Sequence, residues 1–143
     1  MRRRAVQAAA VLATLVVLAA GAFSFPVLFT EYQDDSADWS AAVTAIEVDA
    51  AAGVQVGVER IGGKKGVADA RWQTDSVLGR AEVTATESGR LTARCHTPTP
   101  LSRCTIWLTV RAPATTRVVI VQRPGATIAG TDPRVPVEVR QAS

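Results

Sequence analysis

Few residues of this 143-residue chain are of the types that perform catalysis or bind metals. His96 is its only histidine, and Cys95 and Cys104 are its only cysteines. These three side chains have the chemistry of metal ligands, but adjacent strand residues point to opposite faces, which separates Cys95 from His96. A catalytic pair built on a serine or a cysteine would also have to use this one histidine. We therefore expect no catalytic residue, no metal site and no cofactor.

The acidic residues in the middle of the chain are also poorly placed for catalysis. Glu47, Asp49 and Glu59 alternate with apolar residues, which places them on the outer face of strands, where pairing with arginines is their ordinary role. Glycosidic chemistry would instead need two acids that converge in a cleft. Residues 62–66, GGKKG, lack the spacing of a phosphate-binding loop. An exported hydrolase-like enzyme is thus an alternative, and a domain without catalysis is the main interpretation.

The first thirty residues have the charge pattern of a membrane anchor. Arginines at positions 2–4 precede an apolar run over residues 5–30 that contains no ionisable side chain, and acidic residues follow from Glu31. As a helix this run would be about 39 Å long, against about 30 Å for the hydrocarbon core of a bilayer. It predicts a single-pass anchor over residues 1–30 in the cell membrane, with the N-terminus in the cytoplasm and the remainder extracytoplasmic. A signal peptide cleaved near Ala22, which would give a secreted protein, is the alternative.

Beyond the anchor the charges balance, because thirteen basic and thirteen acidic residues follow position 30. Without an excess of positive charge, nucleic acid is not an expected partner. Residues 31–42 read as an acidic linker, and residues 43–143 suffice for one domain with one core.

The remaining domain has the apolar periodicity of β-strands. Apolar residues recur at every second position in several runs, and glycines and prolines separate these runs. We expect an all-β domain of seven to nine strands, an antiparallel β-sandwich or a short β-ladder whose strands are mostly joined as hairpins. Trp72 and Trp107 are expected in the core or covering a face, and Trp39 at the membrane surface or at the open end of the sheet.

Four segments resemble one bacterial family, in this order: AIEVDAAAGVQVGVE, LTARC, CTIWLTVRAPATTRVVI and GATIAGTD. Together they resemble the putative-adhesin or toast-rack β domain, a domain of unknown function, over roughly 85 residues. The resemblance implies an exported or membrane-anchored protein whose strands stack into a sandwich or short ladder. It also implies a loose association with the cell envelope and further ladder rungs after GATIAGTD. Because such rungs are not found here, we expect VPVEV to form an edge strand, where Pro136, which has no N–H, is tolerated.

Cys95 and Cys104 are expected to form a disulfide that closes the loop HTPTPLSR, since paired cysteines are usual in an exported chain. Antiparallel pairing of the strands on either side of this loop would bring both sulfur atoms to one face.

Together these features predict a structural or binding role at the bacterial cell envelope. The candidate partners beyond the lipid bilayer are a cell-wall polymer or another envelope protein. This domain could bind such a protein by adding a strand to its sheet. The excised domain is expected to be a monomer or a weak dimer, since Pro136 and its neighbouring arginines disfavour pairing of the edge strand with another chain.

Overall fold

The computed structural model describes residues 30–61 and 66–143. The chain divides into two units after Thr30, and the β unit, Glu31–Ser143, is the one described. No helix within the described ranges is long and apolar enough to cross a membrane. The predicted anchor, except for its last residue, lies outside these ranges.

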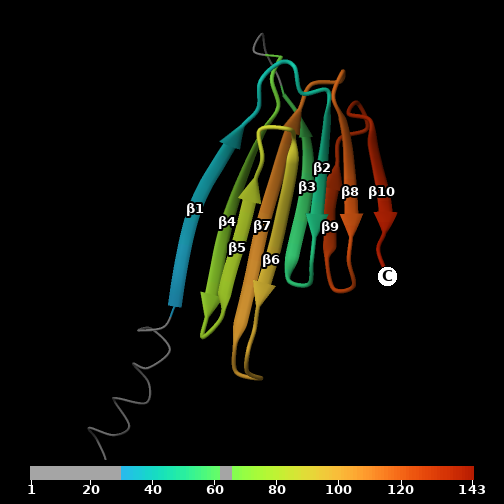
Figure 1. The fold of residues 1–143 in the computed structure, drawn as a ribbon. Helices are drawn as coiled ribbons and strands as arrows, with labels where there is room; N and C mark the ends of the chain where they lie inside the picture. The colour runs from blue at the N-terminus through green and yellow to red at the C-terminus, as the bar shows by residue number, and fades with distance from the viewer. Residues whose placement is uncertain (1–29, 62–65) are drawn as a thin grey trace, which may run out of the picture. The chain divides into compact units, whose positions relative to one another are not determined.

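The described residues of the β unit form ten strands in two five-stranded sheets (Figure 1). Sheet A has the order β1-β4-β7-β3-β9, and sheet B has the order β10-β8-β2-β6-β5. The all-β expectation is therefore confirmed for the described residues. The strands are β1 (Thr30–Asp38), β2 (Ala45–Ala50), β3 (Val54–Arg60), β4 (Asp69–Val77), β5 (Arg80–Ala85), β6 (Arg90–His96), β7 (Arg103–Ala112), β8 (Arg117–Gln122), β9 (Thr127–Thr131) and β10 (Val137–Gln141).

Most neighbouring strands run parallel, so the expectation of an antiparallel sandwich built of hairpins is wrong. In sheet B, β10, β8, β2 and β6 pair in parallel, and in sheet A so do β7, β3 and β9. Antiparallel pairing joins β4 to β7 and β5 to β6. The reason is that the turn after β2, β4, β6 or β8 leads to a strand of the opposite sheet instead of returning beside the same strand, whereas β5 and β6 are consecutive neighbours in sheet B.

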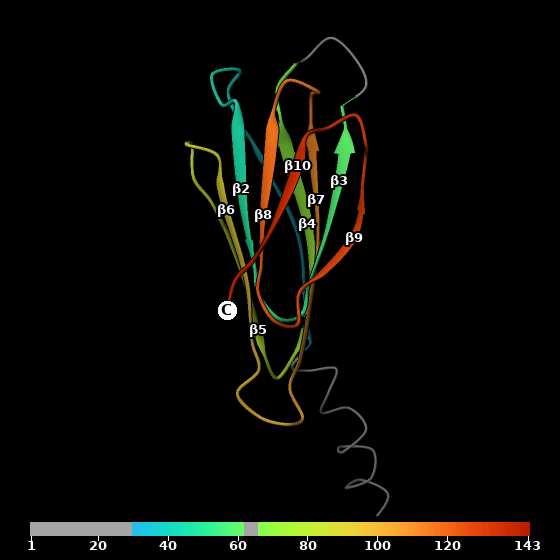
Figure 2. The same ribbon diagram turned by 90° about the vertical axis from the view of Figure 1, so that its right-hand side faces the viewer.

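Each such pair forms a β-arch, with one strand in each layer, and the arches stand side by side (Figure 2). Two of the crossing turns need glycine. Gly53 has a φ of +83° and Gly125 a φ of +84°, a region that residues with a Cβ rarely adopt. The Gly53 N–H also donates a hydrogen bond to the Gly125 carbonyl over 3.2 Å, so that the turns of neighbouring arches are bonded to each other.

The core lies between the sheets, where parallel register stacks similar side chains in rows. One row of sheet B joins Leu91, Val48, Ile120 and Val139, and one row of sheet A joins Trp72, Leu108, Val56 and Ile128. All are buried or partly buried except Val139, which is on the edge strand β10. Burial of such side chains, at about 1.5–3 kcal/mol each, is the main force that holds the two layers together.

Three further predictions concern the sheet edges and the open end of the sandwich. Residues 31–42, expected to be a linker, instead contain most of β1, which pairs with β4 at the edge of sheet A and packs Ala37 against the core. Trp39 is buried and donates its indole N–H to the Thr86 carbonyl over 2.8 Å, which closes the open end of the sandwich. The last three residues of VPVEV belong to β10 at the edge of sheet B, as expected, whereas Pro136 precedes the strand and its carbonyl accepts a hydrogen bond from the Val118 N–H.

Candidate functional site

The outer face of sheet A carries a tryptophan that does not belong to the core. In β7, Ile106, Leu108 and Val110 point inward and are fully buried, whereas Trp107 has the opposite parity and is 41% exposed. Register places Gln73 of β4 on one side of Trp107 and Gln55 of β3 on the other. An indole ring between two amide side chains thus faces solvent in the middle of the sheet.

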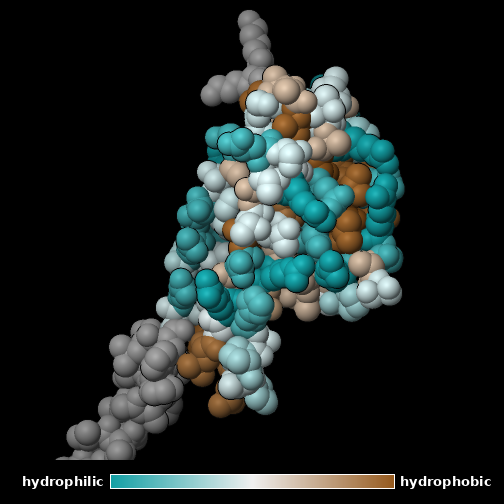
Figure 3. Space-filling model, in the orientation of Figure 1, coloured by the Kyte–Doolittle hydropathy of each residue, from teal (hydrophilic) through white to brown (hydrophobic). Residues whose placement is uncertain are grey.

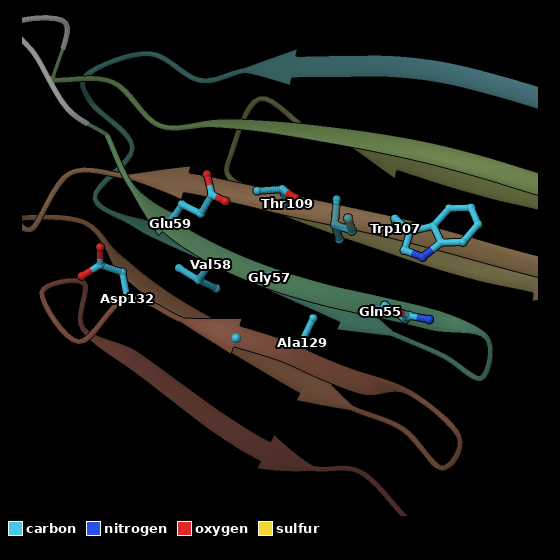
Figure 4. Close-up of a pocket in the computed structure, with 10 residues that line it drawn as sticks. Gln55, Gly57, Val58, Glu59, Trp107, Thr109, Ala129 and Asp132 are labelled. Atoms are coloured by element: carbon cyan, nitrogen blue, oxygen red, sulfur yellow. The ribbon is translucent and has the colours of Figure 1, made fainter.

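Next to this tryptophan the sheet surface is hollowed, with a volume of about 450 Å³ (Figure 4). We call this feature the Trp107 hollow; its lining residues are Gln55, Gly57, Val58, Glu59, Trp107, Leu108, Thr109, Ala129, Gly130 and Asp132. Two glycines make the space. A Cβ at Gly130 would meet no atom within 4 Å, and a Cβ at Gly57 would only touch the Leu108 carbonyl oxygen at 4.0 Å.

An irregularity of the edge strand β9 adds to the hollow. The register between β3 and β9 shifts after the pair Val56 and Ile128, so that Gly57 lies beside Gly130 and Ala129 is the extra residue. Such a bulge locally bends an edge strand. Ala129 and Gly130 both line the hollow.

The end of the hollow opposite Trp107 is acidic, with Glu59 and Asp132 (Figure 4). Asp132 is already engaged: its oxygens accept hydrogen bonds from the Arg134 side chain at 2.9 and 3.0 Å and from the Arg134 backbone N–H. These bonds lower the pKa of Asp132 to about 2, so this carboxylate is charged at all physiological pH values. Glu59 is exposed, and within the described part of the chain no hydrogen bond or ion pair engages its carboxylate.

The outer face of sheet B differs, because its charges are paired with one another. Arg90 lies 3.1 Å from Glu47, its partner in the parallel register, and Arg117 and Arg140 both bond to Glu138. This face shows mainly hydrophilic residues, with a hydrophobic strip over β8 (Figure 3). Its charges satisfy each other and leave little for a ligand to neutralise.

The most buried carboxylate among these pairs is that of Asp49, whose outward position was expected but whose burial was not. Asp49 is 7% exposed, and Arg123 donates two hydrogen bonds to its carboxylate, at 2.7 and 2.9 Å. Arg94 lies 3.9 Å away. The hydrogen bonds from Arg123 lower the pKa of Asp49 despite the opposing effect of burial.

Cys95 and Cys104 are joined by a disulfide, with 5.7 Å between their Cα atoms. The pairing agrees with the prediction, but the geometry on which it was based is wrong. Cys95 belongs to β6 in sheet B and Cys104 to β7 in sheet A, so the bridge links the two layers rather than two strands of one hairpin. A Cβ at Gly53 would lie 2.9 Å from the Cys104 carbonyl oxygen and 3.2 Å from the Cys95 sulfur, so the neighbouring arch leaves no room there.

The remaining candidates from the sequence are not brought together. His96 is exposed, and its Nε2 lies 3.6 Å from a Glu82 oxygen. No group of three or more potential metal ligands occurs among residues 30–61 and 66–143. The GGKKG segment falls mostly outside the described residues.

Comparison with protein-family models, with curated proteins and with solved structures finds no match to this chain.

Proposed function

We propose that the β unit is a non-catalytic binding domain, held outside the cytoplasmic membrane by the N-terminal anchor, that binds a cell-wall polymer through the Trp107 hollow. The observation that carries this proposal is an accessible indole ring beside a hollow lined by glycines and polar side chains. Sugar rings present an apolar C–H face and a hydroxyl edge, so they can stack on an aromatic side chain while amide and hydroxyl groups bond to their edge. Gln55 and Thr109 supply such groups here.

The other depressions of the β unit are less suited to this role. One is lined by the turn from Leu78 to Arg80 and by residues 95–98, and another lies on sheet B around Glu47 and Arg90. Neither contains a tryptophan, and the second is occupied by an ion pair that a ligand would have to break. The outer face of sheet A is therefore the preferred binding face.

The hydrolase-like alternative receives less support from the same hollow. Glycoside hydrolysis needs one carboxylic acid that keeps its proton near neutral pH. Asp132, with a pKa of about 2, is ionised and held by Arg134. Glu59 would be left without a partner acid, so we favour binding without bond cleavage.

The stacked arches suit the ladder that the resemblance to toast-rack-type domains implies, and we propose the same architecture and cell-envelope location for this chain. The location can be tested by adding protease to intact cells. We expect loss of the β unit and retention of a membrane-bound stub of about thirty residues. A soluble form beginning at Phe23 would show that the N-terminal segment is a cleaved signal.

Binding can be tested by cosedimentation of the full-length chain, solubilised in mild detergent, with purified cell-wall sacculi. Trp107→Ala should weaken binding about tenfold or more, as for a central aromatic contact residue. Tyr32→Ala is the matched control, because it removes another exposed aromatic side chain, 63% exposed on β1, away from the hollow. Equal binding by wild type and Trp107→Ala would contradict the proposal.

A further inference from the structure

We propose that the Trp107 hollow selects glycan strands whose sugars carry a protonated amine, and that Glu59 is the residue that recognises the amine. The inference rests on the proposed function and adds the chemical class of the ligand. It follows from which charges around the hollow are already paired and which is not.

Two pairs of charged residues lie near Glu59, and in each pair the two side chains are bonded to one another. Asp132 is bonded to Arg134. Arg111, which pairs with Glu59 in the β3–β7 register, donates hydrogen bonds to both oxygens of Asp69 on its other side. Arg111 therefore attracts Glu59 only at longer range. Among the residues that the structure describes, no cation is hydrogen-bonded to Glu59, which leaves one negative charge at the end of the hollow.

This charge favours cationic ligands over anionic ones. A polymer that carries phosphate or carboxylate groups would be repelled by Glu59, and no unpaired arginine or lysine lines the hollow within the described residues. A protonated amine would instead form a charge-assisted hydrogen bond with this carboxylate. Charge complementarity therefore points to a sugar with a free amino group.

The spacing of Trp107 and Glu59 requires more than one sugar unit. Gln55 is the register partner of Trp107, and Glu59 follows four residues later on the same strand. At about 3.3 Å per residue and 4.8 Å between strands, the Cα atoms of Trp107 and Glu59 are about 14 Å apart. A sugar stacked on Trp107 and a neighbouring sugar near Glu59 can occupy the hollow together. In a polymer that carries an amine on every unit, any register of the strand presents one to Glu59.

Three β-1,4-linked oligosaccharides of equal length provide the test, because they differ only in the group at C2: amine in glucosamine, acetamide in N-acetylglucosamine and hydroxyl in glucose. Titrations with the full-length chain in detergent should be done at a pH at which the amine is protonated. We expect the glucosamine oligomer to bind about two- to fivefold more tightly than the other two, the range for a partly exposed ion pair. The preference should fall as salt is added.

Variants separate this inference from the proposed function. Glu59→Gln should remove the preference for the amine and leave binding of the glucose oligomer unchanged, whereas Trp107→Ala should weaken binding of all three. Glu82→Gln is the matched control, since Glu82 is a half-exposed carboxylate on the outer face of sheet B, near His96. Equal binding of the three oligomers by wild type, or an amine preference that survives Glu59→Gln, would overturn the inference and leave the proposed function standing. Failure of all three to bind would overturn both.

Discussion

Removal of the inter-sheet disulfide should lower the stability of the β unit by a predictable amount. Cys95 and Cys104 are separated by nine positions, and restricting an unfolded chain by a loop of this size is worth about 2.6 kcal/mol at 25 °C. For a domain of this size, the double variant Cys95→Ala/Cys104→Ala should therefore unfold roughly 10 °C below the wild type. Loss of packing against the turn at Gly53 would add to this decrease.

Thermal unfolding followed by circular dichroism checks this value, with the oxidised full-length chain, the reduced wild type and the double variant measured in the same detergent. Leu101→Ala is the control, because Leu101 lies within the closed loop and is 78% exposed, so its removal should change the midpoint by less than about 2 °C. If reduction and the double substitution both leave the midpoint unchanged, the constraint between the layers does not stabilise the fold. Alkylation of the unreduced chain at two cysteines would show that the bridge is absent.

Further predictions concern single sites of the β unit. Gly53→Ala should destabilise it by about 1–3 kcal/mol, because the backbone has a positive φ and the added Cβ would meet the Cys104 carbonyl oxygen at 2.9 Å; Gly57→Ala, with 4.0 Å to its nearest atom, is the control and should have little effect in urea unfolding. Acid should destabilise the fold in part through Asp49, whose pKa is lower in the folded state than in the unfolded chain. Its contribution is therefore present above pH 4 and is lost as the pH falls below the unfolded value of about 3.9. Asp49→Asn should be less stable than wild type at pH 7 and should lose less stability on acidification, and parallel curves of stability against pH for the two proteins would contradict this role.

The sequence predicts the all-β class because alternating apolar residues reveal each strand whose inner face is apolar. It misses β4, where two of the inward residues, Thr74 and Ser76, are polar and yet 4% and 2% exposed. Buried hydroxyl groups conceal the period of two. It also misses β1, whose residues are exposed on both faces except Ala37, and β9, in which only Ile128 is partly buried.

Parallel pairing could not be predicted from periodicity, because a short turn such as residues 51–53 can lead either to a neighbouring strand or to the opposite layer. Only contacts between distant segments distinguish the two, and they are not visible in local patterns. The Trp107 hollow could be predicted only in part from the sequence. The parity of Trp107 relative to Ile106 and Leu108 places its ring outside the core, whereas its position beside Gly57 and Gly130 depends on the parallel pairing of β7, β3 and β9.

The order of the arches has a consequence for the kinetics of folding. The β2–β3 arch comes first among the arches in the chain but lies in the middle of the stack, between arches formed from much later residues. Glu47 pairs with Arg90, and Ile46 pairs with Val118, so the central strand gains its neighbours only when distant segments arrive. The chain must lose the entropy of closing these long loops before the contacts between the strands can form and stabilise it. Folding is therefore expected in the millisecond-to-second range. During synthesis, β2 and the valine-rich strand β3 therefore lack their sheet neighbours until β6 and β7 have emerged, and this interval is when the chain is most prone to aggregate.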